Sequence, residues 1–513
     1  MNMFKSAIVA ATLLLSGCLS EEVELNPGNR NDAAGQGTYA TFNVALSDPI
    51  TKTDLVNDDG ETDQISSIRI LIYQDYNTLN SVCESDVVVM ASDRKSATFQ
   101  ATSGWKRILV IANDYNKPWR LPNQTGKTLA DLTTTKTTVS GGRIAAGEID
   151  CGAPAITTAI DTLKGLDFSS ISNPKNMIFS NSLADSSCRR QLKGSVPSEE
   201  SIAGIKGEAD NNFTIYVKRV VAKVTASFQG GAYPIETADG KGSLSSVYWG
   251  VRNINRAVSI FQVPHTSGKP LAPFFYELTG WSKTALSDQN SYKRYWWTND
   301  YGNDINFPLA TGGNSSLRSY YIPENANYIA QPGNTTYIAV KGTFTPAANS
   351  VVTGFTHNAA TKFITAVKKG SIDPGTTFYR LSGIAGTDGS EKIALYGDGH
   401  IASGDFFADA EEALKVAYIA EHHGSIIGYS NDYTPKNIKI DKYNNGICYY
   451  RVDIHNGDNY WVERNKAYRG NINGFTSIGD PDMYDIESVP MSTYITASII
   501  VIPWEEVVFS NTI

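Results

Sequence analysis

The sequence has few of the motifs that carry catalysis or bind a metal. It contains six histidines, but no HExxH zinc motif, no GxSxG nucleophile motif and no Walker A phosphate loop. The adjacent His422 and His423 point to different sides of any regular element, so they do not favour a shared metal ion. From these absences we expect a protein that is not an enzyme, holds no metal and needs no cofactor.

Cysteine is also scarce, with five in 513 residues, and no two of them form a CxxC pair. Four lie downstream of residue 18: Cys83, Cys151, Cys188 and Cys448. Their irregular spacing argues against a zinc site. In an oxidising compartment Cys151 and Cys188 could pair, but free thiols fit the sequence equally well, so the disulfide state stays open.

Basic charge and long apolar runs are missing as well. The net charge is −8 and the pI is about 5.4, which argues against nucleic acid as a partner. The apolar run Ala7–Leu15 is too short to span a bilayer, and Lys5 precedes it. The run ends in Leu15-Ser16-Gly17-Cys18, which matches a bacterial lipobox. We therefore predict a signal peptide at residues 1–17 and a lipid on the Cys18 thiol.

What the chain does have is β-structure. Its 27 tyrosines, 43 glycines and many short alternating segments favour strands joined by turns. Its length favours more than one domain, and no internal repeat is visible. We expect a mainly β fold of two β-sandwich domains, 53–230 and 231–513, that meet near Gly230. The few helices should be short, and the best candidate is Ser403–Glu421, with Ser403 or Asp405 as its N-cap.

The first predicted strand is Thr38–Leu46, with the sequence TYATFNVAL. Alternate apolar residues share one face of it: Ala40, Phe42, Val44 and Leu46. A polar tether precedes this strand and a charged, turn-rich loop, residues 47–64, follows it. Proteolysis in these segments would remove the strand and leave an apolar groove for a strand from another molecule. Residues 18–52 are thus predicted to be an anchor, a tether and a removable first strand.

Short motifs spread along the chain resemble one family. The lipobox is accompanied by Val217–Val224 (VKRVVAKV), Asn334–Gly342 (NTTYIAVKG), Cys448–Ile454 (CYYRVDI), Val462–Ile472 (VERNKAYRGNI), Ile478–Pro481 (IGDP) and the terminal Tyr494–Trp504. In this order they resemble the strand motifs of the fimbrillins, the type V pilus subunits of the Bacteroidia, and most of all the shaft subunits of the minor fimbrium.

The resemblance implies two transthyretin-like β-sandwiches in a lipoprotein that is anchored in the outer membrane as a precursor. It further implies that a trypsin-like, gingipain-type protease removes the first strand, and that copies then polymerise by donor-strand exchange into a fimbrium on the cell surface that supports adhesion. Accessory anchor and tip subunits would be the other partners.

Two basic residues are candidates for the cleavage. A cut after Arg30 would leave the first strand in place, whereas a cut after Lys52 would remove it, so we predict Lys52. The tail that follows Trp504 is the candidate donor strand. Its apolar residues Val507, Phe509 and Ile513 fall on one face of an extended strand.

An alternative function is a surface lipoprotein that binds a glycan or a host protein, either as a monomer or as a pilus tip adhesin. A tip subunit would lack a usable C-terminal donor strand, because no subunit follows it. The strand-like tail of this chain therefore favours the shaft subunit.

Overall fold

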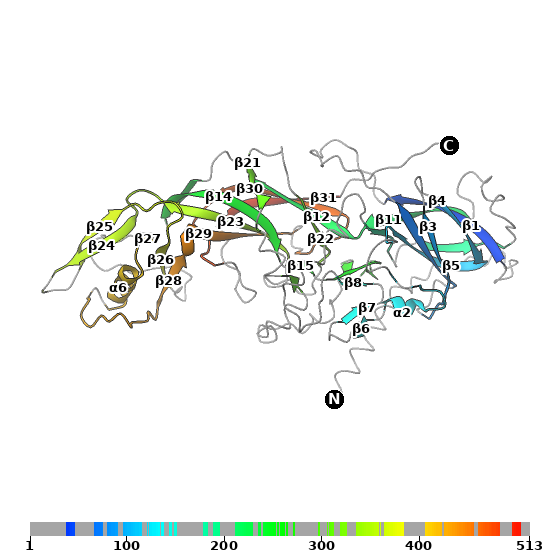
Figure 1. Cartoon of the computed structure of the whole chain (residues 1–513), viewed down its shortest axis with the longest axis horizontal. Helices are drawn as coiled ribbons and strands as arrows, with labels where there is room; N and C mark the ends of the chain where they lie inside the picture. The colour runs from blue at the N-terminus through cyan, green and yellow to red at the C-terminus, as the bar shows by residue number, and fades with distance from the viewer. Residues whose placement is uncertain are drawn as a thin grey trace, which may run out of the picture.

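The computed structural model places three lobes in a row (Figure 1). It describes residues 37–46, 66–74, 80–90, 96–114, 121, 123–133, 135–137, 143–145, 148–150, 178–182, 188–194, 211–228, 234–237, 240–252, 254–255, 257–261, 263–264, 270–271, 296–297, 305, 307–311, 319–325, 335–358, 360, 364–383, 406–422, 425–455, 460–482 and 495–503. Within these residues the fold is mainly β, as predicted from the sequence, and the α-helices described are α2 and α6. No helix in them combines the length and the apolar composition that a membrane span requires.

The N-terminal lobe is built on an eight-stranded sheet in the order β3-β2-β5-β9-β11-β1-β4, with β10 added to β5. Its strands are β1 (Gly37–Leu46), β2 (Ser67–Tyr73), β3 (Cys83–Met90), β4 (Ser96–Thr102), β5 (Gly104–Ala112), β9 (Phe179–Ser180), β10 (Arg189–Leu192) and β11 (Asn212–Arg219). All of β2 and most of β5 are buried, because their sequences SIRILIY and RILVIA are almost continuously apolar.

Short elements complete this lobe. They are α2 (Leu129–Thr133), the paired β6 (Thr135–Thr137) and β7 (Arg143–Ala145), and β8 (Glu148–Asp150), which pairs with β16 (Ala257–Ser259).

The chain passes from the first core to the second at Val220. The sequence predicts one long strand over residues 212–228 that can bend near Val220-Val221, and the structure divides it there into β11 and β12 (Val221–Phe228), which lie in different sheets. Val220 and Val221 pack in the N-terminal core, whereas Ala222 already belongs to the next one.

The middle lobe is a β-sandwich of two five-stranded sheets. One has the order β21-β12-β30-β31 with β22 on β12, and the other has the order β13-β14-β23-β29 with β20 on β14. Apart from β12, the strands of these two sheets are β13 (Pro234–Thr237), β14 (Gly240–Arg252), β20 (Phe307–Pro308), β21 (Ala310–Thr311), β22 (Ser319–Pro323), β23 (Tyr337–Pro346), β29 (Ile447–Asp453), β30 (Lys466–Phe475) and β31 (Ile495–Pro503). Val224 and Ile472 from one sheet share a core with Trp249, Val340 and Tyr450 from the other.

Two further pairs of short strands are formed by residues that lie between the sandwich strands in the sequence. They are β15 (Ile254–Asn255) with β19 (Trp296–Trp297), and β17 (Val263–Pro264) with β18 (Pro270–Leu271).

The third lobe interrupts the middle sandwich between β23 and β29 and lies at the end of the molecule opposite β1 (Figure 1). Its sheet has the order β25-β24-β27-β26-β28. The elements are β24 (Val351–His357), β25 (Ile364–Gly370), β26 (Phe378–Gly383), β27 (Phe406–Phe407), α6 (Ala410–Glu421), β28 (Ile438–Tyr443) and the 3-10 turn η6 (Asn444–Gly446). Ala413, Val416 and Ala417 of α6 pack with Phe407 in its core.

The predicted start of this helix was wrong. Phe406 and Phe407 are buried in a strand, so the helix begins only after them. Asp409, rather than Ser403 or Asp405, is the N-cap, and its side chain accepts hydrogen bonds from the backbone N–H groups of Glu411 and Glu412. The domain limits 53–230 and 231–513 stay a prediction.

Candidate functional site

The candidate site is the position of β1 inside the N-terminal sheet. Residues Thr41–Leu46 pair in parallel with Asn212–Val217 of β11, and Gly37–Asn43 pair antiparallel with Ser96–Thr102 of β4. The first strand of the described chain is therefore an interior strand with backbone partners on both sides. This position between β4 and β11 is called the β1 slot, and β4 and β11 are its two walls.

The β11 wall of the slot has one buried face. Ile215 and Val217 are fully buried, whereas Tyr216 between them is 46% exposed. The register places Val44 opposite Ile215 and Leu46 opposite Val217. The alternation predicted for β1 thus matches, in period and in phase, the alternation of burial on the strand beside it.

β4 is held at one end by a partly buried polar cluster, which we call the β4 anchor: Glu84 of β3, Thr102 of β4 and Lys106 of β5. Thr102 donates from its backbone N to Glu84 Oε1 (3.2 Å) and from its hydroxyl to Glu84 Oε2 (2.6 Å). Lys106 Nζ donates to Glu84 Oε2 (3.0 Å) and to Thr102 Oγ1 (2.5 Å). The side chains of Lys106 and Glu84 are only 3% and 9% exposed.

The β11 wall is fixed through the junction with the middle sandwich. Arg219, the last residue of β11, donates from Nη1 to Asn465 Oδ1 at 3.2 Å. Asn465 has a positive φ of 58°, a conformation that asparagine tolerates better than most residues, and its backbone N donates to Val221 O at 2.9 Å. Two motifs that lie far apart in the sequence, VKRVVAKV and VERNKAYRGNI, therefore meet at this junction.

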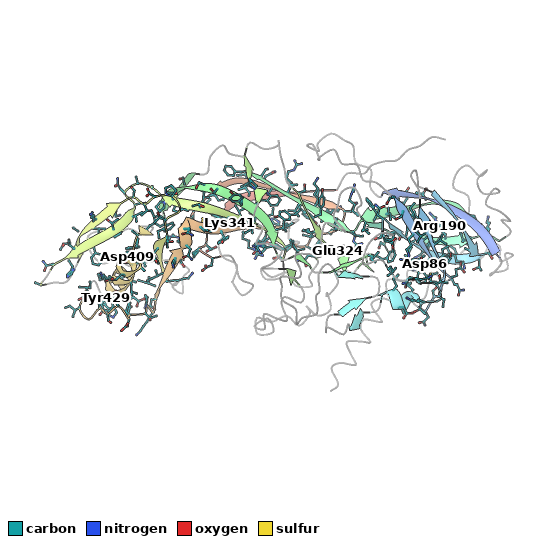
Figure 2. All side chains as sticks on the ribbon, in the orientation of Figure 1. Asp86, Arg190, Glu324, Lys341, Asp409 and Tyr429 are labelled. Atoms are coloured by element: carbon teal, nitrogen blue, oxygen red, sulfur yellow. The ribbon has the colours of Figure 1, made fainter. Side chains whose placement is uncertain are left out.

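A buried ion pair lies at the same junction. Arg464 donates to both carboxylate oxygens of Glu324, and Nη2 lies 2.6 Å from Oε1. Arg464 Nη1 also donates to Ile260 O at 2.9 Å, and Ile260 packs in the N-terminal core. Glu324 lies between the N-terminal lobe and the middle sandwich (Figure 2). Sequence reasoning missed Glu324, because nothing in its neighbourhood marks a buried carboxylate.

The C-terminal strand β31 lies at the end of its sheet. Ile495–Pro503 pair antiparallel with Lys466–Phe475 of β30, and β31 is the last strand in the sheet order. This part of the C-terminal region thus pairs within its own sheet. The remaining predicted sites lie outside the described residues: the signal peptide 1–17, Cys18, Arg30, Lys52, Val507, Phe509 and Ile513. The structure describes the backbone of the strand that carries Ala40, Phe42, Val44 and Leu46.

The described thiols show no sign of a reactive nucleophile. Cys83 and Cys448 are buried free cysteines. Burial raises the pKa of the Cys83 thiol to about 11 and that of Cys448 to about 12, so both stay protonated at neutral pH. Cys188 is also buried, and Cys151 lies outside the described residues. No group of histidine, cysteine and carboxylate side chains that could hold a metal ion occurs in the described part of the chain.

Comparison with known proteins finds a family match in the N-terminal part of the chain. Residues 40–142 match the family of the major fimbrial subunit protein (FimA). The match begins within β1 and extends past β5, so it includes most of β1 and all of β4. It confirms the resemblance to the fimbrillins and supports a structural subunit of a fimbria. No curated protein matches the sequence.

Three solved structures are similar to this chain over most of its length, at low identity and low TM-score. A putative cell adhesion protein from Parabacteroides distasonis is 14% identical, with 93% of this chain and 99% of that chain covered and a TM-score of 0.42. A fimbrilin (FimA) from Porphyromonas gingivalis is 13% identical, with 92% and 98% covered and a TM-score of 0.39. The tip fimbrial protein Mfa3 from Porphyromonas gingivalis, truncated at its C-terminus, is 12% identical, with 90% and 99% covered and a TM-score of 0.33.

Proposed function

We propose that the protein is a shaft subunit of a cell-surface fimbria, exported as a lipoprotein, matured by removal of β1 and polymerised by donor-strand exchange. The observation that carries this proposal is the place of β1. It is the first strand of the described chain, yet it lies inside the sheet between β4 and β11. An interior strand near a chain end can leave after a single cut in the chain that follows it.

The energetics give the sequence of events. While β1 is in place, the facing edges of β4 and β11 are both paired with it. Neither edge then offers free backbone hydrogen-bonding groups to a strand of another subunit. Loss of β1 exposes backbone donors and acceptors on both edges. A donor strand that fills the slot regains on the order of ten backbone hydrogen bonds at about 1 kcal/mol each, together with the apolar burial. The filled slot should therefore be very stable.

The maturation steps involve the predicted processing sites. The lipid on Cys18 would hold the precursor in the outer membrane, and a trypsin-like or gingipain-type protease would cut after Lys52. The cut removes β1 together with the anchor, whereas a cut after Arg30 would release the anchor and keep β1. The partners are further copies of the same chain, with accessory anchor and tip subunits at the two ends of the fibre.

The proposed donor is the C-terminal tail with Val507, Phe509 and Ile513. Its period of two suits the alternating burial of β11, where Ile215 and Val217 are buried and Tyr216 is exposed. The tail follows β31, which keeps its own pairing with β30 in the described chain.

The test is polymerisation of the purified full-length protein after limited trypsin treatment. We expect a ladder of denaturation-resistant multimers after cleavage and a monomer without it. A Lys52→Gln variant treated in the same way should stay monomeric. A cleaved wild-type protein that remains monomeric would contradict the shaft assignment and favour the alternative, a monomeric surface-binding protein or tip adhesin.

A further inference from the structure

We propose that the β4 anchor, made by Glu84, Lys106 and Thr102, is a positioning device that keeps β4 in place as a wall of the slot while β1 is absent. The proposal rests on the proposed function, because it concerns the interval between the loss of β1 and the arrival of the donor strand.

The need for such a device follows from the sheet topology. Within the described residues, the strand paired with β4 is β1, and β4 is the last strand in the sheet order. Removal of β1 therefore takes away the backbone pairing of β4 along Ser96–Thr102. An unpaired strand of this length would lose its register, and the slot would lose one of its two hydrogen-bonding edges.

Two connections to the rest of the lobe remain when β1 leaves. The first is covalent, since only Ser103 separates β4 from β5. The second is the β4 anchor, which binds both the backbone N and the hydroxyl of Thr102. Both connections lie at the same end of β4, where Ala101 is also buried in the core. The β4 anchor thus holds the Thr102 end of β4 against the core. This sets the direction of the rest of β4 along the β1 slot.

The chemistry of the anchor suits this role. Glu84 and Lys106 lie on β3 and β5, which keep their own pairings with β2 when β1 is absent. Their charges are nearly buried and satisfy each other, so the pair has a strong preference for one geometry. The Thr102 hydroxyl both donates to Glu84 and accepts from Lys106. The wall is therefore attached to strands that do not take part in the exchange.

The test compares the uncut chain with the cut chain in three full-length variants. Glu84→Gln removes the charge of the anchor, and Thr102→Val removes its hydroxyl bonds while it keeps the size of the side chain. Asp86→Asn is the matched control, because Asp86 lies on the same strand and forms an equally buried ion pair with Arg69 at 2.6 Å, away from β4. Melting of the uncut chains measures general destabilisation. A labelled synthetic peptide with the β1 sequence GTYATFNVAL is then added to the trypsin-cut chains. Its affinity measures how well the empty β1 slot accepts a strand.

We expect wild type and Asp86→Asn to take up the peptide with similar affinity after the cut. Glu84→Gln and Thr102→Val should lose at least about tenfold in peptide affinity, although their uncut melting temperatures are no lower than that of the control. Equal uptake by all four proteins, or an equal loss in Asp86→Asn, would overturn the anchor alone. A cut wild-type protein that takes up no peptide would overturn the strand-exchange function itself, and the anchor with it.

Discussion

Arg464 and Glu324 form a fully buried ion pair at the junction of the N-terminal lobe and the middle sandwich, with 2.6 Å between Nη2 and Oε1 and exposures of 1% and 0%. Because Arg464 also binds Ile260 O in the N-terminal core, the pair attaches one lobe to the other. Together with the hydrogen bond from Arg219 to Asn465, it makes the junction a specific polar contact rather than a flexible linker.

The first prediction concerns this junction. Glu324→Gln should lower the free energy of unfolding by about 3–5 kcal/mol, because it leaves the Arg464 charge buried without its carboxylate partner. Urea denaturation followed by circular dichroism measures the change. The control is Glu411→Gln, which breaks the exposed pair with Lys415 and should cost no more than about 1 kcal/mol. Equal effects of the two substitutions would show that the buried pair does not stabilise the junction.

The second prediction concerns lipidation. Cys18→Ala should leave an unprocessed precursor that incorporates no labelled palmitate, because the acylated thiol is missing. Metabolic labelling and gel mobility in cells that express the variant measure both properties. Cys83→Ala serves as the control, since that thiol is buried in the fold and should not affect the label. A Cys18→Ala protein that still carries label would refute the lipobox.

The third prediction concerns the maturation cut. Subunits taken from assembled fibres should begin at Thr53, because a cut after Lys52 removes β1 from the slot. N-terminal sequencing decides the point. A start at Asn31 would mean that the cut follows Arg30 and that β1 stays with the subunit. Lys52→Gln should block fibre formation, whereas Arg30→Gln should leave it unchanged.

The fourth prediction concerns the donor tail. Deletion of Val507–Ile513 should leave a folded, exported and cleaved monomer that cannot extend a fibre. Phe509→Asp should have nearly the same effect, since burial of an unpaired carboxylate in the slot costs several kcal/mol. Gel ladders and electron microscopy of the products measure assembly, and Ser510→Asp, on the opposite face of the extended strand, is the control. Full-length fibres from the truncated protein would place the donor elsewhere.

The sequence predicted the strands well where the pattern is local. The alternation of TYATFNVAL predicted β1. It could not predict that β1 pairs with β11, because that pairing joins residues about 170 positions apart, as with Thr41 and Asn212, and alternation says nothing about which strand lies alongside.

The polar contacts that matter most were also beyond the sequence. Glu84 and Lys106 look like ordinary charged residues at the ends of strands, and only the fold brings them to Thr102. The start of α6 was misplaced for a related reason. Tertiary contacts bury Phe406 and Phe407 in a sheet and override the helical pattern around them, so the helix begins at Ala410, with Asp409 as its N-cap.

The passage of the chain from the N-terminal sheet to the middle sandwich at Val220 has a mechanical consequence. β11, one wall of the slot, continues through this single residue into β12, which pairs along Lys223–Phe228 with β30 of the middle sandwich. In the proposed fibre, tension on an inserted donor strand would pull along β11 and pass through the covalent backbone into the next sheet. The hydrogen bonds of both ladders would then be loaded together in shear, and the lobes would resist extension as one continuous element.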